Sequence, residues 1–435
     1  AASDVYKRQD RGYHTGAFIG SRVLDRRFGL GRGFDVYGDR MPAETIGEYG
    51  YPERDAEAVT DVALEWLRGL PAGEPFFLWI HYYDPHAPYA PAGIAAGATV
   101  EAAYSAEIAA VDRQIGRLLA ALPGRVPDHL VAVVGDHGEA LGAHGERTHG
   151  VFLYRETLEV PLILAGPGVP SGHREETTVA IRGLAATLLR LIGADEAAGH
   201  FEPGLVVNSA SDQVTAVYSE SQMPLAAYGW APLEAITTDR WRFISAPRQE
   251  LYDLAEDPSE SFNVAESNEK VARRLERRLG ELKAAMSVGD AEDAELDHET
   301  AEALRALGYV AGTLGAGDGI DPKDGMAILA AMDQARTVLN RGESRRAMEI
   351  LGPLVERNPS NIPLLTRLAQ AQLETGQVKS ALSTYERAVE LDPGSEFLRL
   401  NLAHALRRSG RVEEARGAYE AVLSIDSRNL PAWLN

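Results

Sequence analysis

HLVAVVGDHGEA, residues 129–140, is the stretch that decides the fold. Its apolar half, residues 129–134, predicts a buried strand of a parallel sheet, because a strand covered on both faces carries a continuous apolar run. Asp136 and His137 follow directly. Ligands of open α/β sheets gather at the carboxyl ends of the strands, and a carboxylate beside an imidazole can there reach one divalent cation. The stretch therefore predicts an α/β domain with a metal site at this strand end.

Histidines cluster near this stretch. Of the eleven histidines in the chain, three lie between residues 137 and 149, namely His137, His144 and His149, and His81 and His86 form a second group. Scattered structural histidines would not be expected to bunch in this way. We expect His81, inside a predicted strand, to be a satisfied core residue, and His144 at most to support the ligands. The clustering favours a functional site over an ordinary loop.

Strand-like and helix-like segments alternate between residues 11 and 310, which is typical of an α/β domain. His86 follows the first of the clear strands on a loop that contains Pro85 and Pro88, so we expect it at the same sheet edge as Asp136. The apolar patterns predict strands at residues 76–82, 129–135, 160–166 and 214–219, and helices at residues 55–70, 104–122 and 181–192.

Length and composition limit the possible partners and the possible chemistry. A chain of 435 residues predicts roughly two to four domains. The formal net charge of −21 argues against nucleic acid or an anionic membrane as a partner. The chain has no cysteine, which excludes disulfides and thiolate metal ligands. No apolar run reaches the roughly 18 residues of a transmembrane segment. The first residues, without an initiator Met, lead us to expect a fragment.

A different pattern follows a Gly-rich stretch at residues 308–324, which we interpret as an interdomain linker. Beyond it, Gly342, Gly376 and Gly410 are spaced by 34 residues. A period of 34 with two helices in each unit resembles the tetratricopeptide (TPR) repeat. We expect repeats at about residues 325–359, 360–393 and 394–427, and the start of a fourth at residues 428–435. The predicted boundaries are thus an α/β domain at residues 10–307, the linker, and an all-α solenoid at residues 325–435.

Several further motifs resemble the sulfatase branch of the alkaline phosphatase superfamily. The resemblance is nearly continuous from residue 12 to 310, and it closes as in bacterial sulfatase-like hydrolases that carry TPR repeats. It implies an alkaline phosphatase-like sandwich with a mostly parallel central sheet. The motifs are residues 76–89, 134–154 and 160–163, GPG at 166–168, TLL at 187–189, LYDL at 251–254, DPSE at 257–260 with Asn263, and LGYV at 307–310.

The resemblance also implies a division of labour. Asp136 and His137 match the pair that binds the active-site divalent cation, Ca2+ in a sulfatase and Zn2+ or Mn2+ in a phosphoesterase. His86 matches the histidine that holds the ester oxygens or protonates the leaving group. His149 lies twelve residues after His137, where sulfatases usually place a lysine. A histidine at this offset is similar to that of phosphoethanolamine transferases and metal-rich phosphoesterases, where it can bind a second metal.

Three functions therefore stay open. The first is a metal-dependent hydrolase of sulfuric esters, whose TPR repeats bind a partner protein or mediate self-association. The second keeps the fold but acts on phosphate esters, as a phosphodiesterase, phosphonate hydrolase or phosphoethanolamine transferase. The third is a non-catalytic TPR scaffold. In the resembled family the nucleophile is a formylglycine, Ser or Thr near the N-terminus, so we expect the fragment to be inactive by itself. The family also favours a periplasmic or extracellular location.

Overall fold

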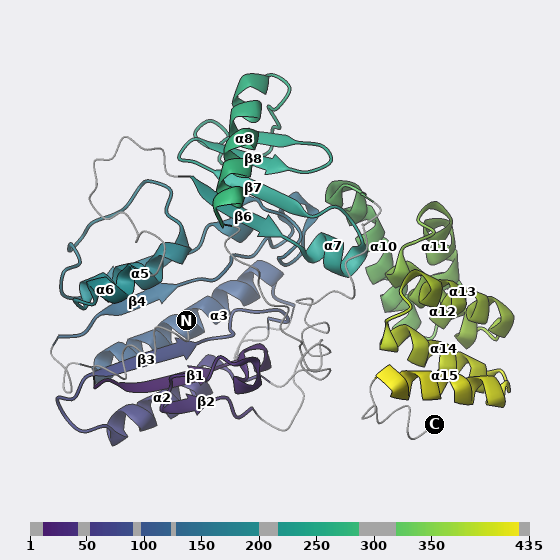
Figure 1. Cartoon of the computed structure of the whole chain (residues 1–435), viewed down its shortest axis with the longest axis horizontal. Helices are drawn as coiled ribbons and strands as arrows, with labels where there is room; N and C mark the ends of the chain where they lie inside the picture. The colour runs from purple at the N-terminus through teal and green to yellow at the C-terminus, as the bar shows by residue number, and fades with distance from the viewer. Residues whose placement is uncertain are drawn as a thin grey trace. The chain divides into compact units, whose positions relative to one another are not determined.

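The computed structural model of the chain describes residues 12–41, 53–89, 97–122, 128–199, 216–286 and 319–425 (Figure 1). Two compact units make up the chain. The first consists of residues 1–148 and 156–217, and the second of residues 149–155 and 218–435. Within the described ranges, no helix is both long enough and apolar enough to cross a membrane.

A three-stranded parallel sheet forms the centre of the first unit. β1 (His14–Ile19) lies between β2 (Val36–Gly38) and β3 (Phe76–His81). The register places His14 opposite Phe76 and Ile19 opposite His81, so β1 and β3 end together at their carboxyl ends. Parallel strands with crossover helices confirm the predicted α/β architecture.

Two helices cover one face of this sheet. α2 (Ala56–Gly69) packs on Phe18 of β1, and a partly buried side chain of α3 (Val100–Ala121) joins the same apolar cluster. A Cβ atom at Gly16 would lie 2.8 Å from the ring of Trp66, so only glycine lets the helix approach β1 this closely. Both helices coincide with predicted ones, although α3 begins four residues earlier than expected.

The strand in the opening stretch differs from its prediction. β4 (Val131–Val134) pairs antiparallel with β5 (Leu162–Ala165) in a separate two-stranded sheet, and the side chain of Val134 is 40% exposed. The expectation of a buried strand in a parallel sheet was therefore wrong for β4 in the described part of the chain. The connection holds only short helical turns, and the N–H of Gly135 donates to the carbonyl oxygen of Pro161 at 3.1 Å. This connection therefore places β5 beside β4 in the opposite direction.

Short elements complete the first unit. The helix predicted at residues 181–192 is present as a 3-10 turn followed by α5, and Leu189 packs with Ala194 and Ala198 in a small buried cluster. The remaining elements are η1 (Arg22–Leu24), η2 (Arg26–Phe28), η3 (Ala143–Gly145), α4 (Arg155–Leu158), η4 (Ile181–Gly183), α5 (Leu184–Leu191) and α6 (Asp195–Ala198).

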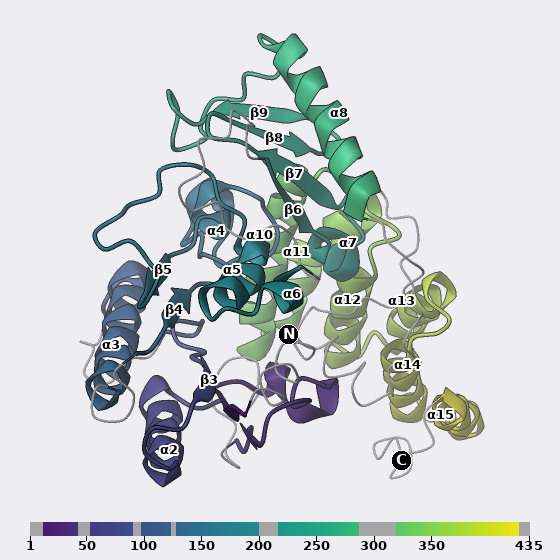
Figure 2. The ribbon, with the colours of Figure 1, turned by 60° about the vertical axis from the view of Figure 1, so that its left-hand side comes forward.

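A four-stranded sheet with the order β6-β7-β8-β9 begins the second unit. β7 pairs antiparallel with β8, and β8 with β9. Figure 2 shows α8 alongside these strands, and α8 contacts β7 and β8. Only the first strand was predicted, at residues 214–219. The elements are β6 (Val217–Ser221), α7 (Met223–Tyr228), β7 (Leu233–Thr237), β8 (Trp241–Ser245), β9 (Glu250–Asp253) and α8 (Glu269–Met286).

Paired helices follow in the second unit and confirm an all-helical repeat region. Gly342, Gly376 and Gly410 lie just beyond the first helix of each pair, with φ of 77°, 80° and 80°, a backbone conformation that favours glycine. The helices are α10 (Pro322–Asn340), α11 (Ser344–Arg357), α12 (Ile362–Glu374), α13 (Val378–Leu391), α14 (Glu396–Arg408) and α15 (Val412–Ile425).

The helical region begins earlier than the sequence indicated. α10 starts at Pro322, inside the range 308–324 expected to be linker, and Asp321 caps it by accepting from the N–H of Lys323. Most of the expected linker, residues 308–318, lies outside the described residues, as does the expected start of a fourth repeat at residues 428–435.

Candidate active site

His86 lies on the loop that follows β3. Its Nδ1 atom is 2.7 Å from the carbonyl oxygen of Ala87, so Nδ1 carries the proton and donates. In the neutral ring Nε2 then accepts from the hydroxyl of Tyr83, at 3.1 Å, and the two rings stack with centroids 4.2 Å apart. Neighbouring residues of the loop therefore orient the imidazole, and the Tyr83 hydroxyl covers the nitrogen that would exchange a proton with a substrate.

Asp136 and His137 lie just after β4, at its carboxyl end. The Asp136 carboxylate accepts from the backbone N–H of His137 through Oδ1, at 2.9 Å. His137 Nδ1 donates to the carbonyl of Gly138 at 3.0 Å, which directs the lone pair of the neutral ring to Nε2. This Nε2 lies 3.9 Å from Asp136 Oδ2. The Asp136 side chain is 79% exposed and the His137 side chain is 40% exposed, so both side chains are accessible.

Gly138 explains why this turn has its shape. Its N–H donates to the carbonyl of Thr157 at 2.9 Å, and a Cβ atom at this position would lie 2.0 Å from the carbonyl oxygen of Glu156. Any larger residue would push the turn away from the segment that precedes β5. The glycine therefore holds the Asp136–His137 pair in place through backbone contact.

His81 is a further candidate for the site, which was not predicted from the sequence. It is the last residue of β3, and its Nδ1 is buried without a hydrogen-bond partner among the described residues, so the expectation of a satisfied core histidine was wrong. Burial lowers the pKa of His81, and the nearby Asp136 carboxylate opposes this shift. This electrostatic effect indicates that His81, at the end of β3, lies near Asp136, which follows β4. The available signal was its grouping with His86.

A second electrostatic link joins the same two loops. Glu139 is buried. Burial raises the pKa of Tyr89, on the loop after β3, and of Tyr104, on α3, and the Glu139 carboxylate raises both pKa values further. The segment after β4 and the segment after β3 thus face each other at two places. The first unit brings Asp136 and His137 to the region that His81 and the His86 loop border.

The other two histidines of the cluster lie differently. His144 adopts a left-handed backbone with φ of 52°, and its Nε2 is 3.8 Å from the Glu156 carboxylate. His149 opens the segment 149–155, which packs within the second unit. Its proximity to Asp136 stays a prediction.

The donor set fits part of a divalent cation site. A carboxylate oxygen and an imidazole nitrogen with its other ring nitrogen held by a carbonyl are ligand types that such a cation accepts. Within the described ranges, no group of three or more His, Asp or Glu side chains is placed to hold a metal. Asp136 and His137 therefore stay predicted ligands, and two side chains do not make a complete coordination sphere.

Glu53 makes the stability of the folded protein depend on pH. Burial, followed by the carboxylates of Asp84 and Glu107, raises the pKa of Glu53 to about 7. The folded protein then retains a proton that the unfolded chain releases, so stability falls as pH rises from the ordinary carboxyl range through 7. Glu53→Gln removes this loss. We expect its gain in melting temperature to be larger at about pH 8 than at about pH 5.

The control for this prediction is Glu65→Gln, at an exposed position of α2. It should change the melting temperature equally at both pH values, as measured by differential scanning calorimetry. A gain for Glu53→Gln at the lower pH that equals the gain at the higher pH would contradict the raised pKa.

Comparisons with known proteins agree with this fold. The sulfatase family model matches residues 5–194, and a model described as bacterial transcriptional activator domain matches residues 347–431. A sulfatase of Formosa agariphila is 29% identical over 195 residues, which cover 44% of this chain and 37% of that protein. Arylsulfatase K of Gallus gallus is 26% identical over 195 residues, covering 41% and 36%. The chain spans little more than a third of the length of these relatives.

A solved structure has a similar fold. The putative sulfatase yidJ of Bacteroides fragilis superposes with a TM-score of 0.50 at 20% identity, covering 65% of this chain and 76% of that one. The N-terminal region therefore resembles sulfatases in sequence, and its fold is the sulfatase-like α/β fold that was predicted. The C-terminal part is a helical repeat region whose matching family model is not that of the predicted TPR repeat.

Proposed function

We propose that the protein is a metal-dependent hydrolase of sulfuric esters. The observation that carries the proposal is the Asp136–His137 pair, with Nδ1 of His137 held by a carbonyl and Nε2 directed 3.9 Å from Asp136 Oδ2, within a sulfatase domain. Both relatives compared above are sulfatases by name. Together they favour sulfate as the group that is cleaved.

Asp136 and His137 would hold the cation, together with further ligands that the described residues do not supply. When bound, a divalent cation stabilises the negative charge that develops on the ester oxygens. Ca2+ is the ion that the resemblance to sulfatases implies, and its preference for oxygen ligands suits the Asp136 carboxylate. Side chains of the protein would then orient the ester and supply the proton that the leaving group takes up.

His86 is the candidate for that proton. An imidazole within hydrogen-bond reach of the leaving oxygen can donate a proton, an effect of roughly a hundred- to ten-thousand-fold in rate. Nε2 accepts from Tyr83 in the structure, so Tyr83 has to release it and the ring has to take up a proton at Nε2 before His86 can protonate a leaving oxygen. His149 would contact the anionic group from the segment 149–155.

The alternative within the same fold is phosphoryl chemistry by a phosphodiesterase, phosphonate hydrolase or phosphoethanolamine transferase. His149 favours it, because a lysine is usual at this offset in sulfatases. An imidazole there could bind a second metal, for which Zn2+ or Mn2+ would be the expected ion.

For the helical repeats we propose binding of a partner protein or self-association. The expectation of TPR repeats rests on the period of 34 and on the three glycines that end the first helix of each pair. A non-catalytic scaffold would use the repeats alone and would need neither Asp136 nor His86.

Calcium titration calorimetry of the full-length protein tests the metal site. We expect His137→Ala to weaken Ca2+ binding on the order of 10- to 100-fold, because one of the two ligands is lost. The matched control is His173→Ala, which removes an exposed histidine paired with Glu175 and should leave binding unchanged. If the native protein binds no divalent ion, the scaffold becomes the better explanation.

Assays of the same full-length protein on p-nitrophenyl sulfate and bis(p-nitrophenyl) phosphate distinguish the two ester classes. Faster cleavage of the sulfate supports the sulfatase. Much faster cleavage of the phosphodiester, especially with Zn2+ or Mn2+, would replace it by the phosphoesterase.

A further inference from the structure

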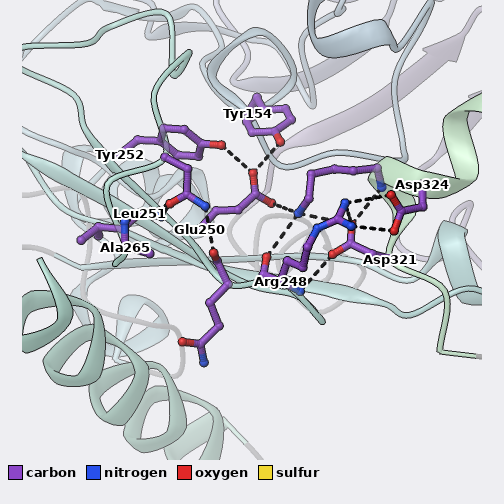
Figure 3. Close-up of polar contacts among 11 residues, drawn as sticks. Tyr154, Arg248, Glu250, Leu251, Tyr252, Ala265, Asp321 and Asp324 are labelled. Atoms are coloured by element: carbon purple, nitrogen blue, oxygen red, sulfur yellow. Dashed lines mark hydrogen bonds and ion pairs between the residues drawn. The ribbon is translucent and has the colours of Figure 1, made fainter. Parts of the chain in front are cut away.

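Glu250, the first residue of β9, is a buried carboxylate that three side chains contact. Its side chain is 3% exposed. Oε2 accepts from the hydroxyls of Tyr154 at 2.7 Å and Tyr252 at 2.5 Å, and Oε1 accepts from the Lys323 ammonium at 2.6 Å. Figure 3 shows both tyrosine hydroxyls directed at this carboxylate. A charge this deeply buried is stable only with such partners, so each one matters to the position of the others.

Two of the three partners come from distant parts of the sequence. Tyr252 lies on β9 itself, whereas Tyr154 belongs to the segment 149–155 and Lys323 to the first turn of α10. All of them belong to the second unit. The carboxylate thus connects the segment that carries His149 to the first helix of the repeat region.

Further contacts keep α10 in place at this point. The Arg248 guanidinium pairs with both carboxylate oxygens of Asp324, at 2.7 and 3.0 Å. The N–H of Arg248 donates to Asp321, the residue that caps α10, and Lys323 also donates to the Arg248 carbonyl at 3.3 Å. Gly325 lies directly against the buried ring of Trp230, where a Cβ atom would approach to 2.6 Å. Lys323 is therefore presented to Glu250 by a docked helix and not by a mobile chain.

The segment 149–155 is held by the same sheet. The Gly150 carbonyl accepts from the Ser221 hydroxyl, and the N–H of Arg155 donates to Glu260 at 2.5 Å. Between these backbone contacts, Tyr154 is the side chain that reaches Glu250. Burial and the adjacent Glu250 carboxylate raise the pKa of Tyr154, so its hydroxyl keeps its proton and remains a donor.

We propose that Glu250 positions the His149 segment, and that the repeat region contributes to this through Lys323. Glu250 and Lys323 are positioning residues, because they act through Tyr154 and touch no substrate. The consequence is that a partner that displaces α10 would loosen the segment that carries His149. The functional consequence rests on the role proposed for His149, whereas the structural coupling does not.

Hydrogen–deuterium exchange of the full chain tests the coupling without any assay of activity. We expect Lys323→Met and Tyr154→Phe each to speed exchange of the peptide covering residues 149–155 on the order of tenfold, as expected for loss of one charge-assisted hydrogen bond. Peptides from β7 and β8 should exchange as in the native protein. Lys323→Arg, which keeps a cation, should restore most of the protection in residues 149–155, a rescue that lost packing alone would not give.

The matched control is Lys379→Met, on the exposed face of α13, which should change no peptide from residues 149–155. Unchanged exchange of this peptide in both Lys323→Met and Tyr154→Phe overturns the proposal. If Lys323→Met unfolds the repeats, Tyr154→Phe decides alone, because it removes a single hydroxyl. Faster exchange together with unaltered activity of His149→Ala would retain the coupling and reject the catalytic role of His149.

Discussion

Replacing Trp230 by Ala should lower the free energy of unfolding of the second unit by about 3–5 kcal/mol, the usual cost of removing a large buried aromatic side chain. The Trp230 ring is 0% exposed and stacks on Tyr228 with centroids 4.5 Å apart. It belongs to the same apolar cluster as Ile328 of α10 and Leu364 of α12. Its loss would therefore leave a cavity between the repeat helices and the segment that precedes β7.

Urea unfolding followed by far-ultraviolet circular dichroism measures this effect. Trp241→Ala is the matched control, because Trp241 lies on β8 of the same unit but is only partly buried and has the Arg240 guanidinium 5.1 Å from its ring centroid. We expect it to cost less than about 2 kcal/mol. Equal losses of stability for the two variants would mean that the Trp230 side chain is not buried in the apolar cluster with α10 and α12.

The second large effect concerns Arg242 and Glu260, an ion pair whose side chains are 2% and 0% exposed. Arg242 Nη1 donates to Glu260 Oε2 at 2.7 Å, and its Nε donates to the Thr237 hydroxyl at 3.0 Å. Arg242→Met leaves a buried carboxylate without its cation. Breaking a buried pair in this way costs about 3–5 kcal/mol, more than the intact pair itself contributes.

A double-mutant cycle separates the two contributions. Arg242→Met combined with Glu260→Gln should recover much of the lost stability, because no uncompensated charge then remains. Arg273→Met removes the cation of an exposed pair with Glu269 on α8, and we expect it to change stability by less than about 1 kcal/mol. If the single variant Arg242→Met were as mild as Arg273→Met, the pair would not be buried in solution.

Local sequence patterns predicted the elements whose cause is local. The apolar periodicity of residues 55–70 led to α2, and the glycines spaced by 34 residues led to the helix pairs, because a left-handed residue must end each first helix. The Asp136–His137 pair could also be found, since both residues follow a strand directly. The environment of His81 was misinterpreted, because whether a ring nitrogen finds a hydrogen bond depends on neighbours distant in the chain.

What the amino-acid sequence determined by itself is the α/β character of the first part, the helical repeats of the second, and the residues available for metal and proton chemistry. The tertiary structure alone decided that β4 runs antiparallel to β5, that Trp230 packs on Gly325, and that Glu250 joins Tyr154 to Lys323. The reason is physical. A side chain carries its propensity and charge wherever it stands, whereas the desolvation that makes one carboxylate bind two partners distant in the sequence exists only after the chain has folded.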